Sequence, residues 1–126
     1  MTTMVYFESA GTAYCMPVDA TRAVRRTSGM IVLPAPDADI AGILPGEPPL
    51  TVISPLGTGG SHVLVVEAGE RTFGLLVDAV TGLRRVADAD IGPSPAGQDR
   101  PLVCGTIDSG EQLVLVTDPD ALAGRL

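Results

Sequence analysis

An internal repeat constrains this sequence more than any other feature. Residues 5–26 align without a gap with residues 64–85, and six of the twenty-two aligned positions are identical. The identical pairs are Glu8/Glu67, Val18/Val77, Asp19/Asp78, Ala20/Ala79, Arg25/Arg84 and Arg26/Arg85. The 126 residues correspond to one domain, so the repeat predicts two similar halves of about sixty residues. Units of about this size are marginal alone, and we expect each half to depend on the other.

Short apolar runs joined by turn residues predict three β-hairpins. Their strands are Val5–Ser9 with Ala13–Pro17, Val63–Glu67 with Thr72–Val77, and Leu102–Ile107 with Leu113–Thr117. Each connecting turn contains glycine, which tolerates the positive φ angles of tight turns. The runs Val63–Val66 and Leu113–Val116 are continuously apolar, which indicates strands covered on both faces. We therefore expect an all-β fold with two small barrels and a third core between them.

Helical signals are few. The segments Val18–Arg26 and Val77–Arg85 are each expected to form a turn or two of helix, and Asp118-Pro119 is a good start for a final short helix that Gly124 would end. Proline cannot donate a hydrogen bond within a sheet, so the proline-rich segments are expected in loops or extended edges. These segments are Leu33–Asp37, Pro45–Pro49 and Pro93–Pro101, and the glycine-rich segment Leu56–Ser61 is the expected joint between the halves.

The charge balance makes several function classes unfavourable. Eight basic residues, all arginine, stand against fifteen acidic ones, giving a net charge of −7. This balance disfavours binding to nucleic acid or to an anionic membrane surface. The sequence shows no apolar run of transmembrane length and no signal-like start, so we expect a cytoplasmic protein. Cys15 and Cys104 are expected to remain reduced there.

Searching for catalytic chemistry yields one weak candidate. The single histidine, His62, has no further histidine or cysteine at zinc-ligand spacing, and we expect no metal and no cofactor. Asp108-Ser109-Gly110 resembles the signature of aspartic proteases, in which two such aspartates share a proton, so this chain would have to dimerise through Asp108. Only the residues from 111 to 126 follow the motif, and the repeat places Pro45 opposite the aspartate. A hairpin turn is the favoured interpretation, and we expect no enzyme.

The repeat also preserves two arginine pairs, Arg25-Arg26 and Arg84-Arg85. They either form solvated strand edges that discourage pairing with other chains or a surface for an acidic partner.

The order of motifs over nearly the whole chain resembles the CheW-like family of chemotaxis coupling proteins. The opening hairpin, from Val5 to Val18, is similar to the family's opening hairpin. Phe73–Val80 is close to a strand of the family in which glycine is followed by apolar residues, valine and aspartate. The resemblance implies two five-stranded SH3-like barrels related by a pseudo-twofold axis, with short helical segments. The expected domain spans residues 4–124, with subdomains of roughly 4–58 and 61–124 and strand exchange between them left open.

The resemblance also implies a non-enzymatic adaptor in a two-component signalling system. Such adaptors couple chemoreceptors to the histidine kinase CheA, binding the kinase's regulatory domain and the receptor's cytoplasmic helical tip, with no insertion into the membrane. The receptor tip is expected in a hydrophobic groove between the barrels, and the kinase on strand ends and loops of the other barrel. The candidates are Val18, Val24, Ile43 and Leu44 for the groove, Leu83, Arg84 and Arg85 for the kinase, and Glu47 at an interface motif.

Three positions depart from the family pattern. Glu47 stands where the family has an arginine, Pro55 where it has an aspartate, and Ala23 where it has a glutamate. The first of these changes reverses a charge. The alternative function is therefore a diverged CheW-like module that serves a different sensory kinase or regulator.

Overall fold

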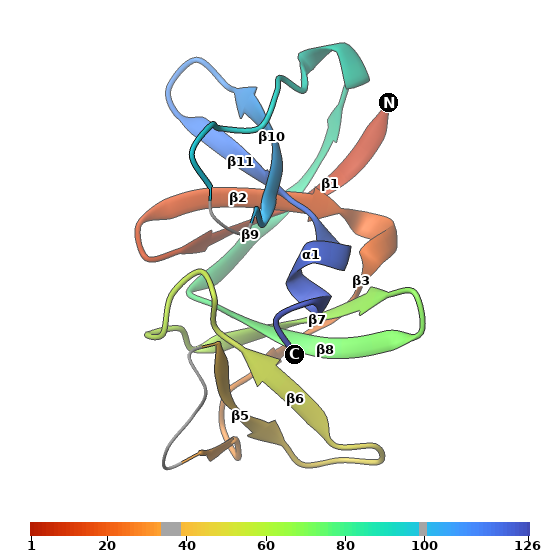
Figure 1. Ribbon diagram of the computed structural model, residues 1–126, viewed down its shortest axis with the longest axis vertical. Coiled ribbons are helices and arrows are strands. Elements are labelled where there is room, and N and C mark those ends of the chain that lie inside the picture. Colours follow the sequence, from red (N-terminus) through yellow and green to blue (C-terminus); the bar gives the residue numbers. More distant parts are fainter. Residues whose placement is uncertain (34–38, 99–100) are drawn as a thin grey trace.

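Eleven strands in two sheets make up most of the part of the chain that the computed structural model describes, residues 1–33, 39–98 and 101–126. Sheet A has the order β10-β11-β2-β1-β9, and sheet B has the order β3-β7-β8-β6-β5-β4. In Figure 1 sheet A lies above sheet B, with helix α1 between them. The strands are β1 (Thr2–Ser9), β2 (Thr12–Pro17), β3 (Thr21–Arg26), β4 (Ile31–Val32), β5 (Ile40–Leu44), β6 (Leu50–Ile53), β7 (His62–Ala68), β8 (Arg71–Val77), β9 (Ala79–Val86), β10 (Val103–Asp108) and β11 (Leu113–Thr117). The proline segment expected at Leu33–Asp37 lies outside the described residues from position 34 onward.

Each sheet combines strands from both halves of the sequence. The first hairpin, β1–β2, lies in sheet A between β9 and β11, whereas the second hairpin, β7–β8, lies in sheet B between β3 and β6. The pairings of β11 with β2 and of β6 with β8 are parallel, and the other pairings are antiparallel. Strands are thus exchanged across the expected division at residues 58–61.

The strand registers reproduce the sequence repeat. Val5 pairs with Leu83 in sheet A, and the repeat-related Leu64 pairs with Val24 in sheet B. Both pairings contain a register shift at the equivalent place, after Tyr6 in one sheet and at the matching step of β3 and β7 in the other. Five strands follow the same order in both sheets and share the bulge, and sheet B has β4 as a sixth strand. The two sheets are thus related by a pseudo-twofold axis, as expected.

The pairings of β6 with β8 and of β11 with β2 show which residues of β6 and β11 correspond in the repeat. Val52 pairs with Gly74, and Val116 pairs with Cys15, so Val52 corresponds to Val116. In the sequence alone, the repeat extends with small gaps to Leu50–Ile53 opposite Leu113–Val116, which places Val52 opposite Leu115. That alignment is wrong by one position because the turns before β6 and β11 differ in length.

Three cores follow from the alternation of side chains along the buried strands. In β7, Val63 contributes to a small core with Leu44, Val52 and Leu76, whereas its neighbour Leu64 faces the large central core. The two faces of a strand alternate along its residues, so a continuously apolar run can serve two cores at once. The central core contains Val5, Phe7, Met16, Ile53, Leu64, Val66, Phe73, Leu75 and Leu122 among its buried residues. Its position between the sheets confirms the expected third core, although Leu113 at the start of β11 is 54% exposed.

Two segments expected to be partly helical are strands instead. Only Val18–Ala20 forms a short 3-10 turn, and the residues after it form β3, while the second segment forms β9. Hydrogen bonding to β7 and β1 outweighs the weak local helical preference. The final helix, α1 (Pro119–Ala123), is confirmed, with the Asp118 carboxylate accepting a hydrogen bond from the Asp120 amide at 3.0 Å.

Candidate protein-docking groove

A groove of about 410 Å³ lies between β3 and β9, the edge strands of the two sheets. Its floor is formed by Val5 and Leu64, and its walls by residues 21–24 of β3 and residues 80–83 of β9, with Val18 at one side. Strand exchange creates this site, because it brings an edge of each sheet next to the shared central core.

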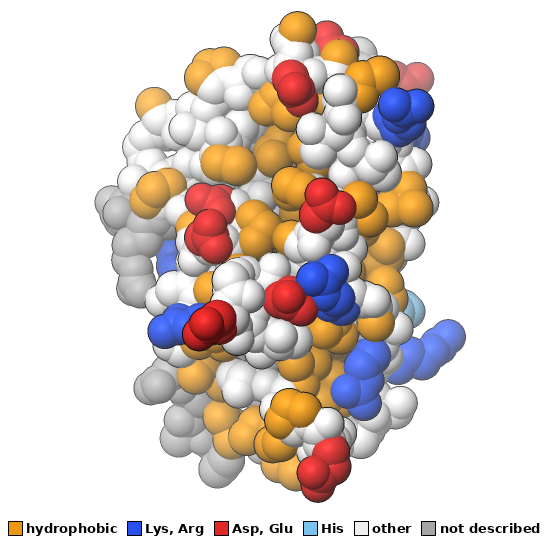
Figure 2. Space-filling view, turned by 90° about the vertical axis from the view of Figure 1, so that its right-hand side faces the viewer, with side chains coloured by type: hydrophobic (Ala, Val, Ile, Leu, Met, Phe, Trp, Pro, Cys, Tyr) orange, Lys and Arg blue, Asp and Glu red, His pale blue; other side chains and the backbone are white. Residues whose placement is uncertain are grey.

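The walls are matched by the pseudo-twofold axis. Val5 and Leu64 are equivalent in the repeat, and so are Val24 and Leu83. The side chains of Val24 and Leu83 are 48% and 63% exposed, although both are apolar. Figure 2 shows a vertical band of hydrophobic side chains on one face of the molecule, with separate arginine and carboxylate side chains beside it. Exposed apolar side chains gathered around a depression are typical of a protein-docking site.

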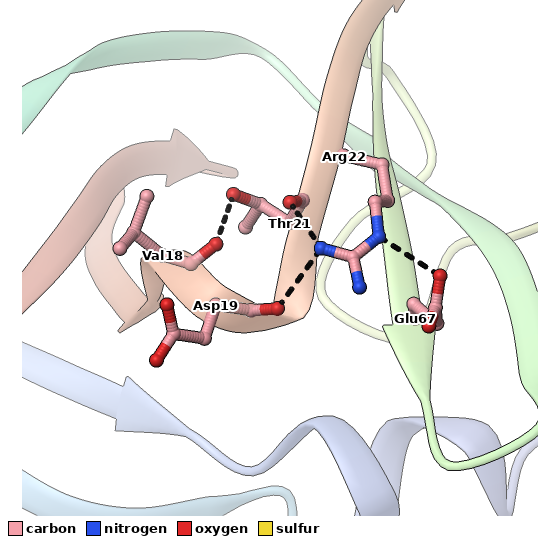
Figure 3. Close-up of polar contacts among 5 residues, drawn as sticks. All are labelled: Val18, Asp19, Thr21, Arg22 and Glu67. Carbon is pink, nitrogen blue, oxygen red and sulfur yellow. Dashed lines mark hydrogen bonds and ion pairs between the residues drawn. The ribbon is translucent and has the colours of Figure 1, made fainter.

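Hydrogen bonds and one ion pair connect the start of β3, at the edge of the groove, to the preceding turn and to Glu67 of β7 (Figure 3). Arg22 Nε donates to Glu67 Oε2 at 2.8 Å, and its Nη1 donates to the carbonyl oxygens of Asp19 and Thr21 at 3.2 and 3.3 Å. Thr21 Oγ1 donates to the carbonyl oxygen of Val18 at 2.8 Å. The hydrogen bond from Arg22 and its positive charge lower the pKa of Glu67, and the same pair raises the pKa of Arg22.

Two of the four residues expected in the groove line it. Val18 and Val24 do so, but Leu44 is 1% exposed within the small core of sheet B, and Ile43 is not among the lining residues. Ile43 and Leu44 therefore do not line this groove. Their strand, β5, is separated from β3 by β6, β8 and β7, an order that follows from the strand exchange.

The three residues expected near the kinase are divided between two places. Leu83 lines the groove, whereas the Arg84 guanidinium lies over the Tyr6 ring, 5.3 Å from its centroid. Arg84, Arg85 and Tyr6 border a second, polar hollow of about 500 Å³ with Asp90 and Asp108. Burial raises the pKa of Tyr6, and the nearby arginine opposes that shift.

Sequence reasoning missed Val5, Leu64 and Val80 as lining residues. The signal was present in the repeat, because the first two are aligned with each other and Val80 is aligned with Thr21. Without the strand pairing, nothing indicated that these positions meet at one axis.

The positions that depart from the family pattern lie at the surface or close to it. Glu47 is exposed in the turn between β5 and β6, Ala23 is exposed on the wall of the groove, and Pro55 is half-buried after β6. Glu47 is thus well separated in the strand order from the groove, whereas Ala23 belongs to it.

The aspartate of the protease-like motif belongs to a turn. Asp108 is exposed at the end of β10, and its carboxylate accepts a hydrogen bond from the Gly110 amide at 2.9 Å. His62 Nδ1 lies 3.0 Å from Ser61 Oγ and 3.1 Å from the carbonyl oxygen of Asp78. Across residues 1–33, 39–98 and 101–126, no group of three or more histidine, cysteine, aspartate or glutamate side chains is placed to hold a metal ion. Within those same ranges, no helix is long and apolar enough to cross a membrane.

Comparisons with known proteins agree with this architecture. The family model described as CheW-like domain matches residues 44–126. The crystal structure of the scaffolding protein TtCheW from Thermoanaerobacter tengcongensis superimposes with a TM-score of 0.81 at 22% sequence identity, covering 93% of this chain and 84% of that one. A search of curated proteins found no match. The family model covers more than half of the sequence and the structural match shares the fold, so the chain belongs to the family of CheW-like domains, which are chemotaxis adaptors and not enzymes.

Proposed function

We propose that this protein is a cytoplasmic scaffold that couples chemoreceptors to a CheA-type histidine kinase by protein contacts alone. The observation that carries the proposal is the groove on the pseudo-twofold axis, with an apolar floor and with Val24 and Leu83 exposed on its two walls. Exposed apolar surface in a groove stabilises a complex when a partner covers it, and an amphipathic helix presents a matching apolar stripe.

The receptor's helical tip is the proposed occupant of the groove. The groove lies between the two barrels, where we expect the receptor contact from the family resemblance, and the matching crystal structure is that of a scaffolding protein. The kinase's regulatory domain is proposed to contact the hollow beside Tyr6 and Arg84. Tyr6 and Arg84 alternate along β1 and β9 with the groove residues Val5 and Leu83, so the two proposed contacts use different faces of these strands.

Calorimetric titration with purified partners from the same cell tests this proposal. The partners are a receptor-type helical hairpin and the regulatory domain of a CheA-type kinase. Val24→Asp and Leu83→Asp should each abolish hairpin binding and leave kinase binding intact. Leu113→Asp is the matched control, because Leu113 is 54% exposed on β11 and does not line the groove. If the unmodified protein binds neither partner at micromolar concentration, the proposal is wrong.

A second candidate is a diverged module that serves a different sensory kinase or regulator. The reversed charge at Glu47 favours it, because this side chain is exposed in the turn between β5 and β6. Under this alternative, Glu47→Arg should strengthen binding to an ordinary chemotaxis kinase or receptor hairpin. An unchanged affinity would show that the charge at position 47 does not determine which partner the protein binds.

A further inference from the structure

The polar hollow on sheet A is the open end of that sheet's own core. Three of its lining residues, Tyr6, Val86 and Ile107, belong to this core and are 8%, 7% and 6% exposed. They give the hollow an apolar floor. A hollow of about 500 Å³ at the mouth of a barrel, with an apolar floor and a few polar groups around it, is typical of a small-molecule site.

Four charged side chains of both signs surround this floor. Arg84 and Arg85 come from the end of β9, Asp90 from the 3-10 turn Asp88–Asp90, and Asp108 from the end of β10. All four side chains are exposed. The hollow thus offers cationic and anionic groups beside the same apolar surface.

These charges do not neutralise one another. Among the described residues, no nitrogen of either arginine lies within 4.0 Å of a carboxylate oxygen, and the ion pairs found there involve other side chains. The Arg84 guanidinium lies over the Tyr6 ring instead, 5.3 Å from its centroid, and the Asp108 carboxylate accepts a hydrogen bond from the Gly110 amide. Opposite charges that line one hollow without pairing are complementary to a ligand that carries both charges.

The equivalent place in sheet B lacks the aromatic ring and one of the carboxylates. The repeat places Val65 opposite Tyr6 and Pro45 opposite Asp108. It keeps the first arginine of the pair as Arg25. The combination of an aromatic ring with both charges is thus particular to sheet A, and sheet B provides a natural control.

We infer that the hollow binds a small zwitterion with an apolar side chain, of which a free α-amino acid such as L-leucine is the simplest example. Its carboxylate contacts the guanidinium of Arg84, its ammonium group contacts the carboxylates of Asp90 and Asp108, and its side chain covers the floor. A ligand with negative charge alone is repelled by the two carboxylates, and one with positive charge alone by the two arginines. This inference goes beyond the proposed function, because the ligand is a small molecule and not a protein partner.

NMR titration of the whole chain with L-leucine tests the inference. Amide resonances around the hollow should shift and saturate, with a dissociation constant of about 1 to 10 mM for so small a ligand in an open site. Two analogues carry one charge each, because 4-methylpentanoate lacks the ammonium group and 3-methylbutylamine lacks the carboxylate. Each analogue should bind at least about threefold more weakly than L-leucine, since each leaves one set of charges without a partner.

Substitutions in the hollow should change this preference according to charge. Asp108→Asn keeps an acceptor for the Gly110 amide; it should weaken L-leucine binding about threefold and should not weaken 4-methylpentanoate binding. Arg84→Gln should weaken both ligands that carry a carboxylate and spare 3-methylbutylamine. Asp88→Asn is the matched control and should change no affinity by more than about twofold, because Asp88 lies in the same turn as Asp90 but does not line the hollow.

The inference is overturned if L-leucine at up to about 50 mM causes no saturable shift at the hollow. It is also overturned if 4-methylpentanoate binds the unmodified protein as tightly as L-leucine, or if Asp88→Asn weakens binding as much as Asp108→Asn. The analogues are compared on the unmodified protein, so this result does not depend on the folding of any variant. The titration contains neither a receptor hairpin nor a kinase, so its failure would leave the proposed function standing.

Discussion

Replacing Leu44 by alanine separates a core role from a docking role. The side chain is 1% exposed and packs with Val52, Val63 and Leu76 in the small core of sheet B. The substitution removes three carbon atoms, which corresponds to about 2.4 kcal/mol at about 0.8 kcal/mol per buried CH₂. The cavity left behind adds to this cost, as in other buried leucines, where the total is about 3 to 5 kcal/mol. The core is small and close to the sheet edge, so it can partly close around the gap, and we expect a loss near 3 kcal/mol.

Urea unfolding followed by circular dichroism measures this loss. With a slope of about 1 to 3 kcal/mol per molar urea, the midpoint should fall by at least about 1 M with an unchanged slope. Val24→Ala is the comparison, because Val24 is 48% exposed on the groove wall and should change stability by less than about 1 kcal/mol. Hairpin affinity should respond in the opposite order, falling for the Val24 variant and staying normal for folded Leu44→Ala protein.

A loss below about 1 kcal/mol for Leu44→Ala would refute this reasoning. So would normal stability accompanied by lost hairpin binding, because that result would give Leu44 the docking role that its burial denies.

Three further substitutions or reactions test other parts of the structure. Glu67→Gln should lower the melting temperature slightly at pH 7, because the substitution removes the ion pair with Arg22. Arg22 lowers the pKa of Glu67, so the difference in melting temperature between the two proteins should disappear as the pH falls through that lowered pKa, and a difference that persists in acid would contradict the ion pair. Thiol labelling of the folded protein at pH 8 should modify the exposed Cys104 and spare Cys15, because Cys15 is buried and its pKa is raised to about 12. Rapid labelling of two thiols per folded molecule would be inconsistent with this burial. Ala10→Gly should stabilise the protein by about 0.5 to 1 kcal/mol in thermal unfolding, because Ala10 has a φ of 49° in the first turn, and a destabilised variant would argue against strain there.

Much of the fold could be predicted from the sequence, because hairpins and helix ends depend on neighbouring residues and because the sequence repeat marks equivalent strands. Each predicted hairpin joins neighbouring segments, and each is observed with strand bounds within three residues of those expected. The final helix was also predictable, since Asp118, Pro119 and Gly124 act on adjacent backbone groups.

The candidate site was less predictable because it depends on long-range pairing. The family resemblance suggested Val18 and Val24, which line the groove, but equally suggested Leu44, which is buried in the small core of sheet B. Only the parallel pairing of β6 with β8 decides that β5 lies far from the groove. A pairing of this kind joins distant segments, and no local pattern in either strand specifies its partner.

The exchange of strands also determines when sheet A can form during synthesis of the chain. The first hairpin emerges early, but its two outer edges are paired by β9, which ends at Val86, and by β11, which ends at Thr117. The free hydrogen-bonding edge of β1 stays unpaired until β9 has left the ribosome, and that of β2 until β11 has left it. Unpaired edges of this kind make nascent β-proteins prone to aggregation. Ribosome-bound chains that end before β11 should therefore be the form of this protein most dependent on chaperones.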